Sequence, residues 1–372
     1  MMFAAIFGFL IVIGPLVFVH ELGHYFVGRL FGVKAESFSI GMGRELTGWT
    51  DKRGTRWKLS MLPIGGYVKF AGDMGPASTP DPAWLRLPPE EKARTFQGKA
   101  LWQRFLIVAA GPVTNFLVAI AIFAGFFTAF GVPQTPPVVR AVLPRSAAQA
   151  AGLRPGDRII RVAGRDTVSF EAVARIVAFR PGERMIVDIE RGGRPIAVVA
   201  TPAADVSKDR FGNEVRRGLL GVMPGPEEIV RAGPVRVIGE AVGHVFGIVR
   251  TMVDVIGQIV GGERSARELG GPIQIARYSG QQVSMGPLPL IEFMAMISIN
   301  LGFINLLPIP MLDGGHLFFY IVEAVRRRPL PERAQDWAFR SGLALLLGFM
   351  FFVTLNDLGS LGLWDKLAGL IG

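Results

Sequence analysis

The chain has 372 residues, of which 50% are hydrophobic, and a formal net charge of +10. Cysteine is absent, which excludes a disulfide framework, thiolate chemistry and a cysteine-ligated zinc site. The positive charge alone would suit nucleic-acid binding, but the hydrophobic residues collect in long runs, as in membrane proteins whose Lys and Arg lie in cytoplasmic loops. We therefore expect a polytopic α-helical membrane protein with no nucleic-acid partner.

Four apolar runs are long enough to cross the hydrocarbon core of a bilayer. We predict transmembrane helices at residues 1–31, 101–131, 288–325 and 339–372, the third interrupted at Pro308 and Pro310. The first run lacks a charged n-region and a small-residue cleavage site, so we expect a retained helix rather than a removable signal peptide. The connections at residues 32–100 and 326–338 are basic, and the positive-inside rule places them in the cytoplasm. The termini and the middle segment then face outward.

Residues 229–287 contain an apolar stretch that could be mistaken for a fifth span. Between residues 235 and 260 a polar or glycine residue recurs every three or four positions: Arg236, Glu240, His244, Gly247, Arg250, Asp254 and Gln258. This spacing predicts an amphipathic helix that lies on the membrane surface or packs against the core. A charged side chain inside a lone span would be expensive.

Two regions outside the spans have β character. Residues 57–61 alternate between apolar and polar side chains, which indicates a strand, and Pro63, Gly65 and Gly66 predict a turn after it. Residues 132–228 form the expected soluble α/β module between two spans. In chain order it has strands at 138–142 and 158–162, helices at 147–151 and 170–178, and strands at 185–190 and 196–201.

The first span contains His20-Glu21-Leu22-Gly23-His24, an H-E-x-x-H pattern. On a helix, His20 and His24 share one face and can bind one zinc ion, while Glu21 can act as general base toward a water on the metal. Three ionisable residues in an apolar span are costly unless they are used. The structural alternative is a pair of buried, hydrogen-bonded histidines.

A catalytic zinc ion usually has three protein ligands and one open position. His316, His244 and the intramembrane carboxylates are candidates for the third ligand, although His244 is a poor choice because it lies in the surface helix. Asp313 follows the break at Pro308 and Pro310, and broken backbone at membrane depth is tolerated where it lines a cavity. The spacing alone does not separate Asp313 from His316.

Four motifs together resemble the site-2 protease family of intramembrane zinc metalloproteases, most closely its bacterial regulator-of-sigma-E protease branch. They are the H-E-x-x-H pattern, Pro63-Ile-Gly-Gly-Tyr-Val-Lys69, Gly111-Pro-Val-Thr-Asn115 and residues 305–314 with the core Leu312-Asp-Gly314. They occur in the family's order over nearly the whole chain. The resemblance implies a protein of the bacterial inner membrane that holds one zinc ion per chain.

The resemblance also assigns roles to residues. It implies that Asp313, and not His316, is the third ligand, that Asn305 helps to hold the unwound substrate, and that Asn115 lies near the site. It places Gly65, Gly66 and Tyr67 in a membrane-associated β-loop whose edge strand pairs with an extended substrate. The expected reaction is cleavage of a single-span membrane protein, such as an anti-sigma factor or a remnant signal peptide.

The module at residues 132–228 resembles a single PDZ domain, judged from its Ala-Ala-Gly-Leu-Arg-Pro-Gly-Asp turn. A peptide-binding role and a role as size filter or spacer remain open for it. Two further readings compete with the protease: a non-catalytic membrane scaffold that works through the PDZ-like module, and an ordinary metalloprotease on a membrane anchor. The intact His, Glu and Asp set argues against the first, and the apolar run directly before His20 against the second.

Overall fold

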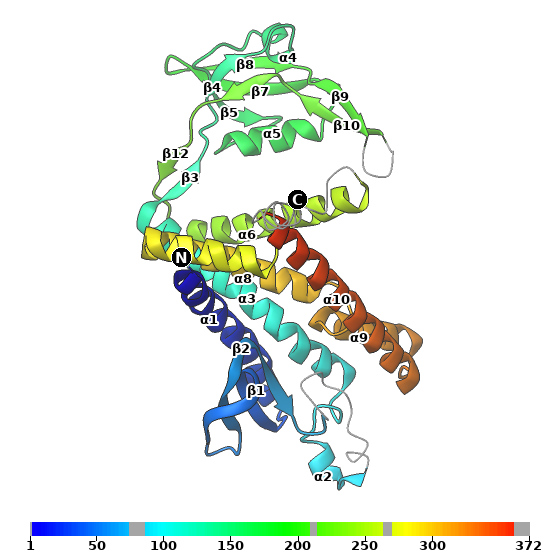
Figure 1. The fold of residues 1–372 in the computed structure, drawn as a ribbon. Helices are drawn as coiled ribbons and strands as arrows, with labels where there is room; N and C mark the ends of the chain where they lie inside the picture. Colours follow the sequence, from blue (N-terminus) through cyan, green and yellow to red (C-terminus); the bar gives the residue numbers. More distant parts are fainter. Residues whose placement is uncertain (1, 74–85, 209–213, 263–269, 361–372) are drawn as a thin grey trace, which may run out of the picture. The chain divides into compact units, whose positions relative to one another are not determined.

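The computed structural model describes residues 2–73, 86–208, 214–262 and 270–360 (Figure 1). The chain divides into two compact units. The first comprises residues 1–123, 241–253 and 264–372, and the second residues 124–240 and 254–263. The end of the fourth expected span, residues 361–372, lies outside the described residues.

The first unit is built on long apolar helices. These are α1 (Met2–Leu30), α3 (Leu101–Phe130), α8 (Pro287–Leu306), α9 (Asp313–Arg326) and α10 (Glu332–Ser360), with the short α2 (Pro89–Lys92) before α3. Helix α10 begins at Glu332, so part of the loop expected at residues 326–338 is helical. Pro15 in α1 and Pro112 in α3 lie inside their helices, which neighbouring helices make tolerable in membrane proteins.

Among the described residues, five helices are long and apolar enough to cross a membrane: α1, α3, α8, α10 and α6 (Pro234–Val260). Helix α6 covers the stretch for which we predicted a surface helix, and it has the lowest mean hydropathy of the five. Length and composition do not decide whether it crosses or lies on the bilayer. The count of four spans therefore stays a prediction.

Helix α7 (Pro272–Met285) packs along α1, which the sequence did not predict. The contact is close at Gly8, where a Cβ atom would lie 2.7 Å from the backbone carbon of Ser279. Val12 and Leu16, which follow Gly8 along the same face of α1, pack with Ile297 of α8 in a small apolar core that Ile275 of α7 also joins. Helices α7 and α8 therefore both contact this face of α1.

The β region follows α1 directly as two long strands, β1 (Ala35–Thr50) and β2 (Arg56–Phe70). The first half of β1 pairs with both halves of β2, since Ser39 is opposite Tyr67 and also opposite Lys58. The turn predicted around Pro63, Gly65 and Gly66 matches the register, because residues 56–59 run in the same direction as the first half of β1 and residues 66–70 run in the opposite direction. The chain therefore reverses between these two halves of β2, where Gly65 has φ +75°, a conformation that glycine adopts readily.

Aromatic packing joins this sheet to α1. Phe38 of β1 stacks on Trp57 of β2 with ring centroids 4.4 Å apart, and Tyr25 of α1 meets both rings edge-on. Phe38 is 1% exposed and Tyr25 is 4% exposed. The sheet is therefore anchored to the turn of α1 that follows His24.

The second unit contains the module between α3 and α6. A four-stranded sheet has the order β6-β5-β7-β8, formed by β5 (Arg158–Val162), β6 (Arg165–Asp166), β7 (Met185–Arg191) and β8 (Arg194–Ala200). The helices α4 (Ala147–Ala150) and α5 (Phe170–Ala178) begin at the N-caps Ser146 and Ser169. Val139, Ile159, Val162, Val187 and Ile189 lie in its core with no exposed surface.

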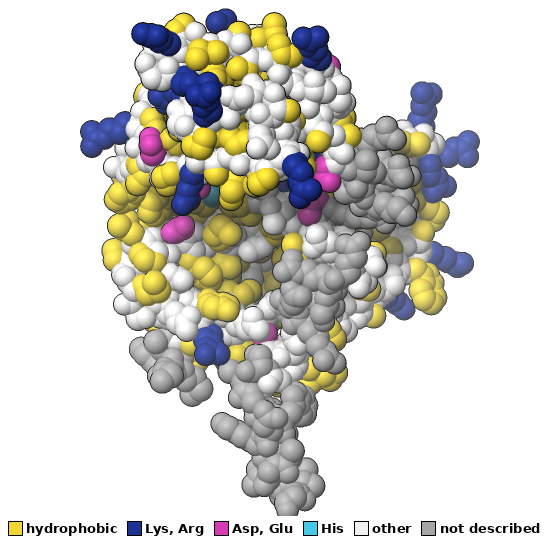
Figure 2. Space-filling model, turned by 90° about the horizontal axis from the view of Figure 1, so that it is seen from above, with side chains coloured by type: hydrophobic (Ala, Val, Ile, Leu, Met, Phe, Trp, Pro, Cys, Tyr) yellow, Lys and Arg dark blue, Asp and Glu magenta, His cyan; other side chains and the backbone are white. Residues whose placement is uncertain are grey.

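Three further strand pairs complete the second unit. They are β4 (Val139–Val142) with β11 (Val222–Pro224), β9 (Ala203–Lys208) with β10 (Glu214–Leu219), and β3 (Val132–Gln134) with β12 (Glu228–Val230). The sequence predicted β4, β5, β7, β8 and both helices, but not β3, β6 or the strands from β9 to β12. Figure 2 shows Lys and Arg spread among hydrophobic side chains on the face seen from above, with few Asp or Glu.

Candidate active site

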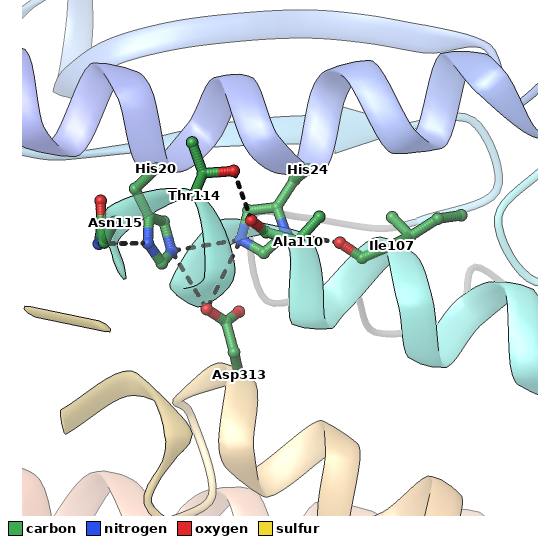
Figure 3. Close-up of polar contacts among 7 residues, drawn as sticks. All are labelled: His20, His24, Ile107, Ala110, Thr114, Asn115 and Asp313. Atoms are coloured by element: carbon green, nitrogen blue, oxygen red, sulfur yellow. Dashed lines mark hydrogen bonds and ion pairs between the residues drawn. The ribbon is translucent and has the colours of Figure 1, made fainter. Parts of the chain in front are cut away.

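The histidines of the H-E-x-x-H pattern lie one turn apart on α1 and point toward Asp313 (Figure 3). Asp313 is the first residue of α9, on the far side of the break in the predicted third span. Its Oδ2 lies 3.1 Å from His20 Nε2 and 3.5 Å from His24 Nε2, and the two Nε2 atoms are 3.2 Å apart. Of all described His, Asp and Glu side chains, only these three converge in this way.

The backbone between α8 and α9 is shaped to place Asp313. Met311 has φ +83°, an uncommon conformation for a residue with a side chain. A Cβ atom on Gly314 would lie 2.2 Å from the carbonyl oxygen of Leu307, and one on Gly315 would lie 2.5 Å from that of Ile309. The two glycines therefore let the broken segment fold closely over the first turn of α9, where Asp313 projects toward α1.

The triangle of ligand atoms fits a tetrahedral metal ion. Zinc bonds of 2.0–2.1 Å separate any two ligands of a tetrahedron by about 3.4 Å, close to the three separations found here. In addition, a Cβ atom on Gly111 of α3 would lie 2.3 Å from His24 Nε2 and 2.8 Å from His20 Nε2. The missing side chain leaves room beside the ligand atoms, so the residues present fit a zinc ion with an open position.

Helix α3 orients both imidazoles through the nitrogens that face away from Asp313. His24 Nδ1 donates a hydrogen bond to the carbonyl of Ile107 at 2.9 Å, which leaves Nε2 free as a ligand. A backbone carbonyl carries no sequence signal, so this contact could not be predicted. Gly23 brings the helices together, since a Cβ there would lie 2.5 Å from the carbonyl oxygen of Ala110.

Asn115, which the resemblance placed near the site without a role, holds His20. Its amide nitrogen lies 3.0 Å from His20 Nδ1, the side chain is fully buried, and its Oδ1 has no hydrogen-bond partner in the described part of the chain. Rotating the Asn115 side-chain amide by 180° exchanges its nitrogen and oxygen and presents Oδ1 to His20. An imidazole that binds metal through Nε2 carries its proton on Nδ1, so in this orientation His20 Nδ1 donates a hydrogen bond to Asn115 Oδ1. Ser298 of α8 donates to the backbone carbonyl of Asn115 at 2.8 Å.

The predicted general base faces the β region. A Cβ atom on Gly66 would lie 3.2 Å from Cγ of Glu21 and 3.1 Å from Cγ1 of Val17. Strand β2 thus passes directly against the turn of α1 that carries Glu21. Tyr67, between Gly66 and Val68, has Lys58 over its ring at 4.9 Å.

The remaining candidates lie elsewhere. His316 is on α9 with Asp313, but its ring packs against Phe339 and Tyr320 at 5.1 and 6.5 Å and it is outside the converging set. His244 contacts Phe123 edge-on. Asn305 is half-buried next to the last residue of α8, and among the described residues no hydrogen bond of its side chain is seen. No contact of Asn305 with His20, His24 or Asp313 is seen among the described residues.

A helical protein with membrane-length spans and a His-His-Asp triangle beside a glutamate has the parts of a membrane metalloprotease. The chain belongs to Peptidase family M50, the site-2 protease family, whose model matches residues 8–349. It is therefore a metalloprotease of a membrane-type family, a peptide-bond hydrolase.

Relatives along the whole chain agree. A protein of Agrobacterium fabrum named "Putative zinc metalloprotease Atu1380" is 44% identical over 95% of this chain and 95% of its own length. Metalloprotease MmpA of Caulobacter vibrioides is 37% identical over 98% of this chain and 99% of its own. The names support zinc as the metal. Among solved structures, the PDZ domain of an SdrC-like protein from Listeria monocytogenes matches 25% of this chain and 90% of that chain, at 17% identity and a TM-score of 0.20.

Proposed function

We propose that this protein is an intramembrane endopeptidase that cuts single-span membrane proteins within or near their transmembrane segment, as a step of regulated intramembrane proteolysis. The observation that carries the proposal is the triangle of His20, His24 and Asp313, which joins one membrane-length helix to a broken one. His20 is 6% exposed, and the side chain of His24 is also largely buried. Both histidines are therefore shielded from bulk water.

His20, His24 and Asp313 would hold one zinc ion per chain, with Asn115 and Ile107 fixing the two imidazoles. When bound, the ion supplies a Lewis acid for the scissile carbonyl and acidifies the attacking water. Glu21 accepts a proton from that water, whose oxygen bonds to the carbonyl carbon. Glu21 then returns the proton to the nitrogen that leaves as the C–N bond breaks, so one water is consumed for each bond cut.

Strand β2 supports the assignment of a substrate-binding role to Gly65, Gly66 and Tyr67. A transmembrane helix offers no accessible peptide carbonyl, so the substrate must be extended before attack. In the described part of the chain, residues 66–70 pair with one neighbour, the first half of β1, and they run past Glu21. An added substrate strand there would lie close to the general base. Asn305, at the end of α8, is proposed to hold the unwound part of the substrate.

The remaining assignments follow from the resemblance and from charge. The protein is proposed to be a multi-pass protein of the bacterial inner membrane, with its basic loops in the cytoplasm and its termini and PDZ-like module in the periplasm. Its proposed partners are the bilayer, a membrane-protein substrate such as an anti-sigma factor or a remnant signal peptide, and a peptide ligand of the PDZ-like module. Nucleic acid is not among them.

The test is Glu21→Gln in the full-length protein. The probe is a single-span fusion protein with a signal-peptide-derived segment and an epitope tag at each end. We expect wild type to separate the tags, and Glu21→Gln to retain zinc, measured by elemental analysis, while cleavage is abolished because the amide cannot accept the proton. Cleavage by the variant at the wild-type rate would refute this mechanism.

The ligand set is tested by the zinc content of two further variants. Asp313→Ala should lose the zinc, since only two ligands remain, whereas His316→Ala should keep it, because its ring lies against Phe339 rather than in the triangle. Zinc retained in Asp313→Ala would mean that another residue supplies the third ligand.

A further inference from the structure

A second candidate site lies at the C-terminal end of α1. A cavity of about 600 Å³ is lined there by Arg29, Gly32, Val33, Lys34, Arg53 and Arg94. Four of these six residues are cations and none is acidic. The side chains of Lys34, Arg53 and Arg94 are exposed, and that of Arg29 is half-buried.

The backbone fixes each wall of this cationic pocket. Helix α1 ends in a Schellman motif: Val33 N–H donates to the carbonyl of Gly28 at 2.9 Å, and Gly32 N–H donates to that of Arg29 at 3.0 Å. Gly32 has φ +74°, the left-handed conformation that this ending requires. The chain therefore reverses direction directly after Arg29, and Lys34 comes back to the same cavity.

Arg94 is held to this turn by a backbone hydrogen bond, and Arg53 is held in a tight loop. Lys34 N–H donates to the carbonyl of Arg94 at 2.9 Å, so these two residues are held together although they are far apart in sequence. Arg53 N–H donates to Oδ1 of Asp51 at 2.8 Å. A fifth cation, Lys99, comes near, since a Cβ on Gly32 would lie 3.8 Å from its Nζ.

No acidic residue among those that line the pocket neutralises its positive charges. Among the described residues, no Asp or Glu lies within ion-pair distance of Arg29, Lys34, Arg53 or Arg94. Asp51 acts electrostatically on Arg29, but its two oxygens already accept hydrogen bonds from Trp57 Nε1 and from two backbone N–H groups. Clustered like charges repel, so an anion that enters the pocket is attracted by all of them.

The surroundings indicate that the anion is part of an amphipathic molecule. Phe26 and Leu30 share one face of the last turn of α1 and are 62% and 79% exposed. Trp102, 59% exposed, packs edge-on against Phe31 with centroids 5.3 Å apart. Exposed apolar and aromatic residues directly beside a ring of cations are the arrangement found where a helix leaves the hydrocarbon core.

We propose that this cationic pocket binds the phosphate group of an anionic phospholipid, whose acyl chains lie along Phe26 and Leu30. The lining of this pocket shares no residue with the zinc triangle. Strand β1 follows Lys34 and pairs with β2 (Figure 1), and Gly66 of β2 approaches Glu21. A bound lipid would therefore tie the base of that sheet to the bilayer surface.

The experiment uses full-length protein in detergent, titrated with phosphatidylglycerol or phosphatidylcholine and read by native mass spectrometry. The pocket variant is Arg53→Gln with Arg94→Gln, two exposed side chains whose loss should not unfold the chain. Arg326→Gln with Arg328→Gln, also exposed, removes the same charge elsewhere. Arg29→Gln is a second pocket variant. Zinc content and melting temperature report that each variant is folded.

We expect wild type and the Arg326 and Arg328 control to retain phosphatidylglycerol in preference to phosphatidylcholine. The double pocket variant should bind phosphatidylglycerol about 25-fold more weakly, because each of the two lost cations contributes roughly fivefold. Equal retention by wild type and both pocket variants, or an equal loss in the control, would overturn the proposal. Displacement of the lipid by a moderate excess of inorganic phosphate would assign the pocket to a soluble phosphate and overturn the lipid assignment.

Discussion

Gly111 shows how much of the metal site depends on a side chain that is absent. Gly111→Ala would place a methyl group against both Nε2 atoms, at 2.3 Å from His24 and 2.8 Å from His20, and the imidazoles would have to move. We expect this variant to lose most of its bound zinc and its activity while the helix forms normally, because Ala favours helix more than Gly does.

The matched control is Gly125→Ala in the same helix, where a Cβ would meet nothing within 4 Å. It should keep its zinc and be as stable as wild type or slightly more so. Both variants are compared by elemental analysis and by thermal unfolding in detergent. Full zinc occupancy in Gly111→Ala would show that the two imidazoles can bind zinc with a methyl group at this position.

At the scale of single residues, the sequence predicted the proposed metal ligands better than the groups that hydrogen-bond those ligands. The H-E-x-x-H spacing identified His20 and His24, but spacing left Asp313 and His316 as equal candidates. The family resemblance favoured Asp313, and the fold gives the physical reason: the break after α8 turns Asp313 toward α1, while His316 packs on Phe339. The contact of His24 with the Ile107 carbonyl is invisible in a sequence, since every residue carries the same acceptor.

At the scale of elements, α7 depends on one buried carboxylate. Asp357 of α10 has no exposed surface, and its oxygens accept from the backbone N–H groups of Gly271, Ile273 and Gln274 at 3.0, 3.0 and 3.2 Å. These are the donors left unpaired at the start of α7. Because the cap comes from a distant helix, it joins α10 to the helix that packs along α1.

Asp357→Ala should therefore destabilise the protein by about 1–3 kcal/mol, the cost of leaving buried donors unsatisfied. Asp357→Asn retains an acceptor and should lose less. The measurement is thermal unfolding in detergent, together with hydrogen exchange of residues 272–285. Ser341→Ala, an exposed hydroxyl in α10, is the control. Unchanged exchange in α7 of the Asp357→Ala variant would contradict a capping role.

Elements with a strong local period were predicted well, and those made by distant pairing were not. The strand at residues 57–61 was recognised from its alternation, and the helix Phe170–Ala178 was predicted with the bounds that the structure shows. In contrast, β3 and β12 have three residues each and pair across the whole module, so neither contains enough residues to show a period. Helix α7 was missed for a related reason: its partner α1 is remote in the chain.

At the scale of the whole molecule, the second unit contains an ion pair whose carboxylate is buried. Asp157, 1% exposed, accepts from Arg191 Nε at 2.6 Å and from Arg191 Nη2 at 2.7 Å, and from the backbone N–H of Arg154 at 2.7 Å. Arg191 also donates to the carbonyl of Gly152 at 2.8 Å, which ties β7 to the turn before β5.

This pair should make the second unit sensitive to acid. Burial acts to raise the pKa of Asp157, but the hydrogen bonds from Arg191 and Arg154 outweigh it, so the pKa lies below its usual value. The unfolded chain then binds the proton more readily than the folded one. The stabilisation is fully present above the unfolded pKa of about 3.9 and is lost as the pH falls through that value toward the folded pKa.

We therefore expect hydrogen exchange in β5 and β7, corrected for the intrinsic rate, to accelerate as the labelling pH falls from about 5 to about 3. Asp157→Asn should exchange faster than wild type at neutral pH and should show less of this acid dependence, because the titrating group is gone. Asp166→Asn is the matched control: this aspartate, 85% exposed, lies 3.8 Å from Arg161 on the same sheet, and its loss should change little. An equal acid response in wild type and Asp157→Asn would place the acid-sensitive group elsewhere. Peptides from the first unit, read in the same experiment, distinguish loss of the zinc site from loss of this pair.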